Sequence, residues 1–181
     1  RTVFGWEMPT LWLQSANSFF VITLAPVFGA LWIWLADRGW EVSSPAKFAF
    51  ALAITGFAFL MMVWASNRVI GGGGLVKVSA LWLIGSYLMQ TFGELSLSPV
   101  GLSSMTKLAP RKFVGQMMGL WFLATAMGNL IAGLVGGAVN PEKLEQMALL
   151  FMRTAMSLFI ASALMGILII PIRRMIATTK D

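Results

Sequence analysis

The sequence predicts an all-α integral membrane protein that crosses the bilayer with five helices. Of the 181 residues, 58% are hydrophobic and only 11% are charged, whereas a soluble domain usually carries about 25% charged residues. The charged residues lie between long apolar runs, and about 20 helical residues are enough to cross a hydrocarbon core of about 30 Å. Composition and run length therefore both place the chain in the membrane class.

Five runs with at most one charged residue each are long enough to span a membrane. They cover residues 11–36, 48–66, 78–104, 114–139 and 147–172 of a single domain, 1–181. Charged loops, a glycine-rich turn at residues 71–74, a polar turn at 140–146 and a basic tail separate or follow them. Because the first residue is Arg rather than Met, we expect upstream sequence to precede the chain.

The distribution of Lys and Arg predicts the orientation of the five spans. The side that contains the tail holds eight of them, namely Arg38, Lys47, Lys107, Arg111, Lys112, Arg173, Arg174 and Lys180. The other side holds four, namely Arg1, Arg68, Lys77 and Lys143. The positive-inside rule places the side richer in basic residues in the cytoplasm. We therefore expect a cytoplasmic C-terminus and residue 1 outside. The expected location of this multi-pass protein is the inner membrane.

Composition also excludes several classes of function. The chain has neither Cys nor His. This excludes disulfides, thiolate nucleophiles, zinc sites and His-ligated haem. No span contains a second acid that would complete a catalytic pair, which argues against an enzyme. We expect no metal and no cofactor. The net charge of +6 comes from loop residues that meet anionic lipid, so nucleic acid is not an expected partner.

The third run carries a single carboxylate, Glu94, near its middle. A charge at the centre of a membrane helix costs about 2.5–3.5 kcal/mol on insertion scales, so such a residue is a candidate functional site. Tyr87, Thr91 and Ser98 share its helix face, and this polar stripe must face other helices or water. Two interpretations stay open: Glu94 binds a cationic ligand group or a proton, or it pairs structurally with another helix.

Uncharged polar and aromatic residues on two other spans are candidates to face this acid. Asn17 in the first run has donors and acceptors suited to amides and carboxylates, although the residues of this run alone favour interhelical hydrogen bonding. In the fourth run, Trp121 and Thr125 lie four residues apart on one face. An aromatic wall beside a hydroxyl suits a pocket, while an interfacial anchor is the alternative for Trp121.

Two further features of the last runs predict packing rather than binding. The fourth run contains the pairs Gly115–Gly119 and Gly133–Gly137, and small residues four apart allow close helix packing. Arg153, near the start of the fifth run, lies close enough to the membrane edge to snorkel. We expect it to have a topological or packing role.

Four segments together resemble the proton-dependent oligopeptide transporters of the major facilitator superfamily. GELSLSPVGLSSMTKLAPRKF and GQMMGLWFLATAMGN, at residues 93–113 and 115–129, carry the most specific motifs. PTLWLQSANSFFVITLAPVFGALW resembles the family's eighth helix, and GILIIPIRRM resembles its twelfth. The resemblance implies that the five spans are helices eight to twelve, which form part of the C-terminal six-helix bundle.

The resemblance implies a role for five residues. Glu94 matches the glutamate that receives the amino terminus of the peptide, and Asn17 matches an asparagine that contacts the peptide backbone. Trp121 and Phe122 match aromatic walls of the side-chain pockets, and Thr125 matches a small hydroxyl position. One departure is Ser18, since the family often has Pro after this asparagine.

The implied function is proton-coupled import of di- and tripeptides, of which this chain supplies only a part. The residues that couple protons lie mostly in the missing N-terminal helices, so these helices, peptides, protons and lipid are the expected partners. Two alternatives stay open. One is a major facilitator carrier for another small solute, and the other is a non-transporting scaffold subunit of a membrane complex.

Overall fold

The computed structural model describes the backbone of residues 2–3, 6–7, 10–40, 42–72, 78–139 and 143–178. It describes the side chains of residues 15–40, 42–72, 78–107, 109–139 and 143–171. Of the residues discussed above, Arg1, Lys77, Arg173, Arg174 and Lys180 lie outside the described side chains.

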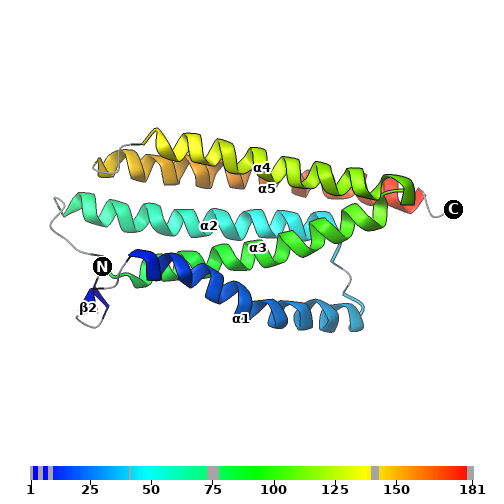
Figure 1. The fold of residues 1–181 in the computed structure, drawn as a ribbon, viewed down its shortest axis with the longest axis horizontal. Coiled ribbons are helices and arrows are strands. Elements are labelled where there is room, and N and C mark those ends of the chain that lie inside the picture. The colour runs from blue at the N-terminus through cyan, green and yellow to red at the C-terminus, as the bar shows by residue number, and fades with distance from the viewer. Residues whose placement is uncertain are drawn as a thin grey trace.

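The described part of the chain is almost entirely helical, and its helices run along the long axis of the molecule (Figure 1). A short antiparallel pair of strands comes first: β1, Thr2–Val3, with β2, Trp6–Glu7. The helices are α1, Thr10–Asp37; α2, Ser44–Gly71; α3, Leu81–Leu108; α4, Val114–Gly137; and α5, Leu144–Thr178. A 3₁₀ turn, η1, at Arg111–Phe113 joins α3 to α4.

Each helix overlaps one expected span, but several helices are longer than the apolar runs. α2 begins four residues before residue 48 and ends five residues after residue 66. The added turns hold Lys47 and Arg68, whose charged groups lie over the rings of Trp32 and Trp64 at 4.0 and 4.3 Å from the ring centroids. A long basic side chain can bury its stem and keep its charge near the interface. A charge therefore ends the apolar run without ending the helix.

Among the residues that the structure describes, four segments are long and apolar enough to cross a membrane: Ser15–Asp37, Ser44–Gly71, Arg111–Gly137 and Leu144–Pro171. The prediction of an all-α membrane protein is confirmed. α3 is 28 residues long, like α1 and α2. It is not among these four segments, because its polar stripe lowers its mean hydropathy. Its passage through the bilayer stays a prediction, consistent with a helix whose polar side chains face protein or water.

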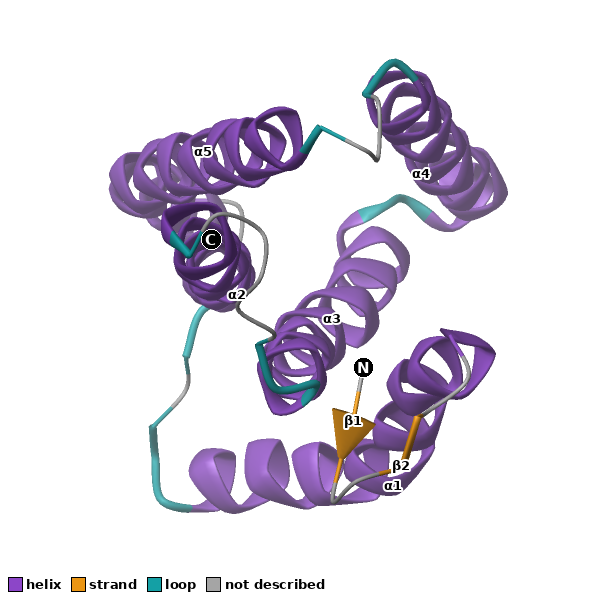
Figure 2. Ribbon diagram, turned by 90° about the vertical axis from the view of Figure 1, so that its left-hand side faces the viewer, coloured by secondary structure: helices purple, strands orange, loops and turns teal. Residues whose placement is uncertain are grey.

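α2 packs against α5 along one side and against α3 along another, and α3 lies between α2, α1 and α4 (Figure 2). Small residues allow this close approach, and Ala51, Ala58 and Ala155 are at most 1% exposed. On the α5 side, the ring of Phe159 lies 3.1 Å from the position of a Cβ on Gly56, and Ser162 Oγ donates a 2.7 Å hydrogen bond to the carbonyl oxygen of Ala49.

Polar groups also hold α3 against α2. Ser86, fully buried, donates to the carbonyl oxygen of Ala58 at 3.1 Å, and Gln90 Nε2 donates to Ser86 Oγ at 3.1 Å. Gly93 is buried beside Thr55, and a Cβ on it would lie 3.0 Å from the carbonyl oxygen of Ala51. The absence of a side chain at Gly93 therefore sets how closely α3 approaches α2 next to Glu94.

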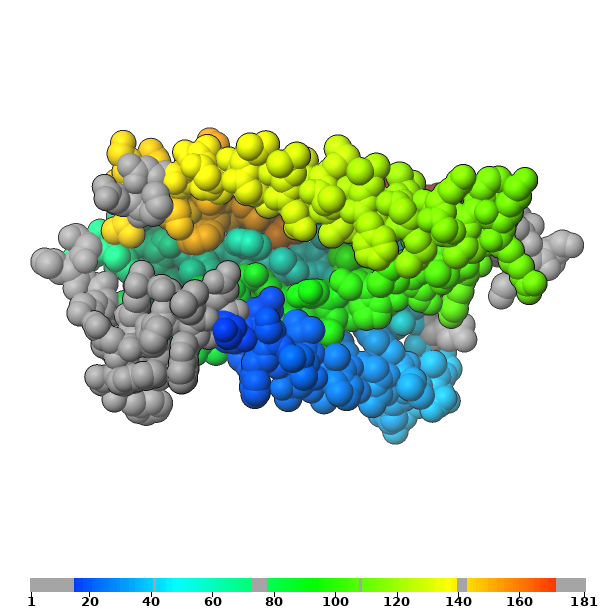
Figure 3. All heavy atoms as spheres, in the orientation of Figure 1, coloured from blue at the N-terminus to red at the C-terminus, as the bar shows by residue number. Residues whose placement is uncertain are grey.

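α1 and α4 each pack mainly on α3, and they also reach α2 through the contacts of Trp32 with Lys47 and of Trp121 with Phe48. They lie at opposite edges of one face of the molecule, with atoms of α3 between them (Figure 3). This arrangement leaves one side of α3 free of α2, and the side chains of that side decide what the site can do.

Candidate functional site

The contact between α1 and α3 includes two of the polar residues that the sequence singles out. Thr91 is fully buried, and its hydroxyl donates to Asn17 Oδ1 at 2.8 Å. The same hydroxyl lies 2.9 Å from the carbonyl oxygen of Tyr87. A hydroxyl has one proton to donate, so Thr91 can serve only one of the two oxygens at a time. The bond fixes the amide of Asn17 against the polar stripe of α3.

Glu94 lies on the side of α3 between its contacts with α1 and α4. Thr91, which contacts α1, lies three residues before Glu94. Gly101, which contacts Trp121 of α4, lies seven residues after it. Residues seven apart lie on nearly the same face of a helix, about 10 Å apart along its axis. The side chain of Glu94 is exposed, and the structure records no ion pair for it among the described side chains.

Trp121 attaches α4 to the rest of the bundle. Its ring lies against Gly101 of α3, where a Cβ would collide with it. The ring also meets Phe48 of α2 edge-on, with centroids 6.3 Å apart and an interplanar angle of 85°. Such edge-to-face pairs are favourable beyond the area that they bury. One face of Trp121 therefore has a packing role.

The other two candidate residues lie on the surface of α4. Thr125 is exposed and donates its hydroxyl to the carbonyl oxygen of Trp121 at 3.0 Å. Phe122 is 60% exposed. No described contact joins either residue, or Trp121, to Glu94 or Asn17. The structure thus brings Asn17 to the polar stripe of α3, whereas no described contact joins the candidate residues of α4 to Glu94 or Asn17.

Three residues that shape this region were not among the sequence candidates. Gly93 and Gly101 set the approach of α3 to α2 and to Trp121, and Phe92 packs on Phe28 of α1 with centroids 5.3 Å apart. Glycine inside a helical pattern often marks a close approach, so the two glycines carried a usable signal. The pairing of Phe92 with Phe28 has no comparable signal, because aromatic residues are frequent throughout the chain.

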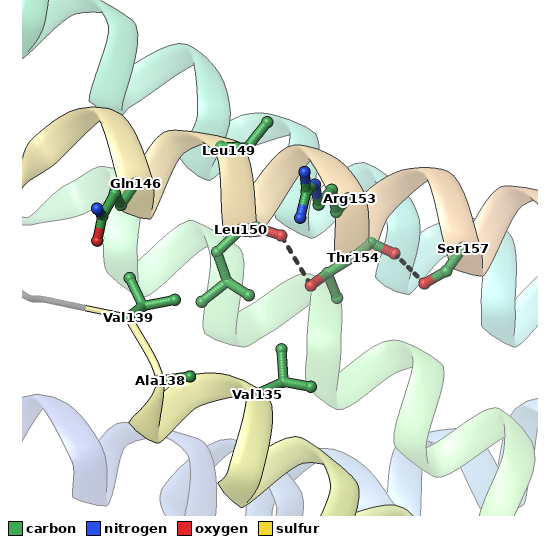
Figure 4. A pocket seen from close by; sticks show the side chains of 9 residues that line it. All are labelled: Val135, Ala138, Val139, Gln146, Leu149, Leu150, Arg153, Thr154 and Ser157. Carbon is green, nitrogen blue, oxygen red and sulfur yellow. Dashed lines mark hydrogen bonds between the residues drawn. The ribbon is translucent and has the colours of Figure 1, made fainter.

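A pocket of about 630 Å³ lies elsewhere, between α4 and α5 (Figure 4). Its lining includes Val135 of α4, Ala138 and Val139 just after the end of α4, and Leu150, Arg153 and Ser157 of α5. We call it the α4–α5 groove. None of the five candidate residues lines it, so it is distinct from the polar side of α3.

Comparison with known families identifies the fold. The family model described as "POT family" matches residues 1–164. The chain belongs to the POT family. The peptide transporter YePEPT of Yersinia enterocolitica subsp. palearctica serotype O:3 (strain YE-P4) is 46% identical to it over 180 residues, which is 99% of the chain and 35% of that relative. The di-/tripeptide transporter of Lactococcus lactis subsp. cremoris is 40% identical over 71% of the chain and 25% of that relative.

Solved structures agree with this assignment. A crystal structure of the peptide transporter POT in complex with sulfate matches with a TM-score of 0.80 and 32% identity, over 95% of this chain and 33% of that chain. A POT family transporter in complex with a thioalcohol-conjugated peptide matches with a TM-score of 0.77 and 27% identity, over 93% of this chain and 33% of that one. The chain thus spans about a third of the length of the POT transporters it matches.

Proposed function

We propose that this chain is the C-terminal part of a proton-coupled symporter that imports di- and tripeptides. The observation that carries the proposal is the carboxylate of Glu94, which is exposed and has no ion-pair partner among the described side chains, on the side of α3 between the contacts that α3 makes with α1 and α4. The family assignment and the names of the relatives support it. Transporters of this kind bind substrate near the bilayer midplane between two halves that move around the site.

In this proposal the carboxylate of Glu94 pairs with the protonated amino terminus of the peptide. Water is largely excluded between the two halves, which strengthens the attraction between the charges, although loss of their hydration offsets part of the gain. Asn17, oriented by Thr91, offers an amide to the peptide backbone. Trp121 and Phe122 supply apolar surface that makes no directional hydrogen bonds, and Thr125 supplies a hydroxyl. Selectivity among the side chains of the transported peptides is therefore low.

No covalent step is part of this function, and the protein is proposed to be a carrier rather than an enzyme. Protons are co-transported, and the groups that bind them lie mostly in helices outside these 181 residues. The protein is a multi-pass membrane protein. We propose the inner membrane as its location, with the C-terminus in the cytoplasm, because basic residues are concentrated on that side.

Competition for uptake tests the substrate class directly. The full-length transporter, reconstituted in liposomes with an inward proton gradient, is assayed for uptake of labelled dialanine. We expect unlabelled di- and tripeptides to compete at micromolar to millimolar concentrations. Sugars, nitrate and free amino acids should leave uptake unchanged, and collapsing the proton gradient should abolish accumulation. Competition by a sugar or by nitrate, with none by peptides, would reject the proposal in favour of another solute.

The hydrogen bond from Thr91 to Asn17 predicts a modest effect on substrate affinity. Thr91→Val removes the hydroxyl and keeps the shape of the side chain, which frees the amide of Asn17 to turn. A net hydrogen bond is worth about 1 kcal/mol, so we expect the KM for a dipeptide to rise about fivefold with little change in kcat. Thr91→Ser keeps the hydroxyl and should keep the KM. An unchanged KM in Thr91→Val would show that the bond does not position Asn17.

A further inference from the structure

Two lysines lie close together at the end of the bundle where α2 begins and α3 ends. Lys47 lies in the first turn of α2, and Lys107 lies in the last turn of α3. They are close enough for their positive charges to repel each other. Neither lysine has an ion-pair partner among the described side chains, and Asp37 at the end of α1 pairs with neither. Because two neighbouring cations repel, this pair favours the binding of an anion.

Trp32 of α1 adds a third donor beside Lys47. The Nζ atom of Lys47 lies 4.0 Å from the centroid of the Trp32 ring, so the ammonium group and the indole are neighbours. The Nε1–H of Trp32 is buried and has no acceptor among the described residues, although a buried indole N–H usually has one. Lysine cannot supply it, because an ammonium group only donates. Three helices thus contribute donors, and no described acceptor, to one region.

This donor cluster, formed by Trp32, Lys47 and Lys107, lies at the depth expected for lipid headgroups. Lys47 directly precedes the apolar run that begins at residue 48, and Trp and Lys are both favoured at the membrane interface. In Figure 1 the C-terminal end of α1 lies apart from that of α3, which leads into α4. Lys107 is exposed and Lys47 is half-buried, so a headgroup at the interface has access to both ammonium groups.

We propose that the donor cluster binds the phosphate group of an anionic membrane lipid. The two ammonium groups neutralise the phosphate and, with the indole N–H, donate hydrogen bonds to its oxygens, and such charge-assisted bonds are the stronger ones. Basic pockets between transmembrane helices recognise lipid headgroups in this way. Free phosphate has the same chemistry, but it lacks the acyl chains that hold a lipid at this depth. The inference concerns a defined site rather than the general attraction of basic loops to lipid, and it does not depend on the transported solute.

Lipid titration followed by native mass spectrometry tests the site. Purified, delipidated full-length transporter is titrated with phosphatidylglycerol or with phosphatidylcholine, and the dissociation constant of the first bound lipid is measured. We expect phosphatidylglycerol to bind at least about tenfold more tightly, and Lys47→Gln and Lys107→Gln each to weaken it at least about tenfold. Trp32→Phe keeps an aromatic ring and removes the N–H, and it should weaken binding about threefold.

Lys112→Gln is the matched control for the two lysine variants. Lys112 is also an exposed cation near the junction of α3 and α4, but it lies outside the donor cluster, and its removal should change the dissociation constant less than about twofold. Lys47→Arg keeps the charge and should bind phosphatidylglycerol nearly as well as wild type. Equal weakening by Lys112→Gln, or unchanged binding in both Lys47→Gln and Lys107→Gln, would overturn the proposal. Displacement of the lipid by inorganic phosphate below about 1 mM would assign the site to soluble phosphate instead.

Discussion

Glu94→Gln is expected to lower dipeptide uptake by the full-length transporter about 100-fold while leaving the amount of folded protein in the membrane unchanged. The side chain is exposed and unpaired within the described part of the chain, so its loss removes no packing contact. It does remove the partner of the peptide amine, and truncating one side of a desolvated charge pair costs about 2–5 kcal/mol. A loss of about 2.7 kcal/mol corresponds to 100-fold. Initial uptake rates in liposomes, normalised to reconstituted protein, measure the effect.

Glu145→Gln is the matched control for this change. Glu145 is also an exposed acid, but it lies in the first turn of α5, where a carboxylate interacts with the helix dipole and takes no part in the proposed site. We expect uptake to remain within about twofold of wild type. Uptake by Glu94→Gln at the wild-type rate would remove Glu94 from the site and would favour a structural role for its carboxylate.

Gly93→Ala is expected to have the largest effect on stability. The added methyl group would meet Thr55 and would lie 3.0 Å from the carbonyl oxygen of Ala51. The backbone of α2 cannot move aside without disturbing its contacts with α5. Overpacking of this kind typically costs about 1–3 kcal/mol, and it would also shift Glu94, the next residue. We expect a thermal unfolding midpoint lower by several degrees in purified full-length transporter, together with weaker dipeptide uptake.

Gly166→Ala provides the same chemical change where there is room. A Cβ on Gly166 of α5 meets nothing within 4 Å, and Ala favours a helix over Gly by about 1 kcal/mol in the interior of a helix. Its unfolding midpoint should equal or exceed that of the wild type. If Gly93→Ala unfolds at the same temperature as Gly166→Ala, close packing of α3 on α2 does not depend on this glycine.

Run lengths and charge positions predicted the helices well, because a helix must be apolar for about 20 residues wherever it meets lipid. They predicted helix ends less well. Lys47 and Arg68 interrupt the apolar pattern but lie inside α2, over the rings of Trp32 and Trp64. The pair of short strands, β1 and β2, had no periodic signal at all, since two residues are too few to show one.

The sequence predicted which candidate residues share a face of one helix, but it could not predict the contacts that those residues make with other helices. Helical spacing placed Thr91 and Glu94 on one side of α3, but it could not show that Asn17, 74 residues earlier in the sequence, accepts a bond from Thr91. The fixing of Trp121 between Gly101 and Phe48 likewise depends on how three helices pack. The glycine pairs of α4 remain a prediction, because Gly115, Gly119, Gly133 and Gly137 have no described neighbour within 4 Å of a Cβ position.

A double-mutant cycle between Glu94 and the peptide amine is the most direct test of the proposed site. Inhibition constants of dialanine and N-acetyl-dialanine are measured against labelled dipeptide in wild-type and Glu94→Gln full-length transporter. We expect wild type to prefer the free amine at least about 100-fold, which corresponds to about 2.7 kcal/mol. In Glu94→Gln the preference should fall below about threefold. The same preference in both proteins would show that the amine binds elsewhere and would contradict the assignment of Glu94.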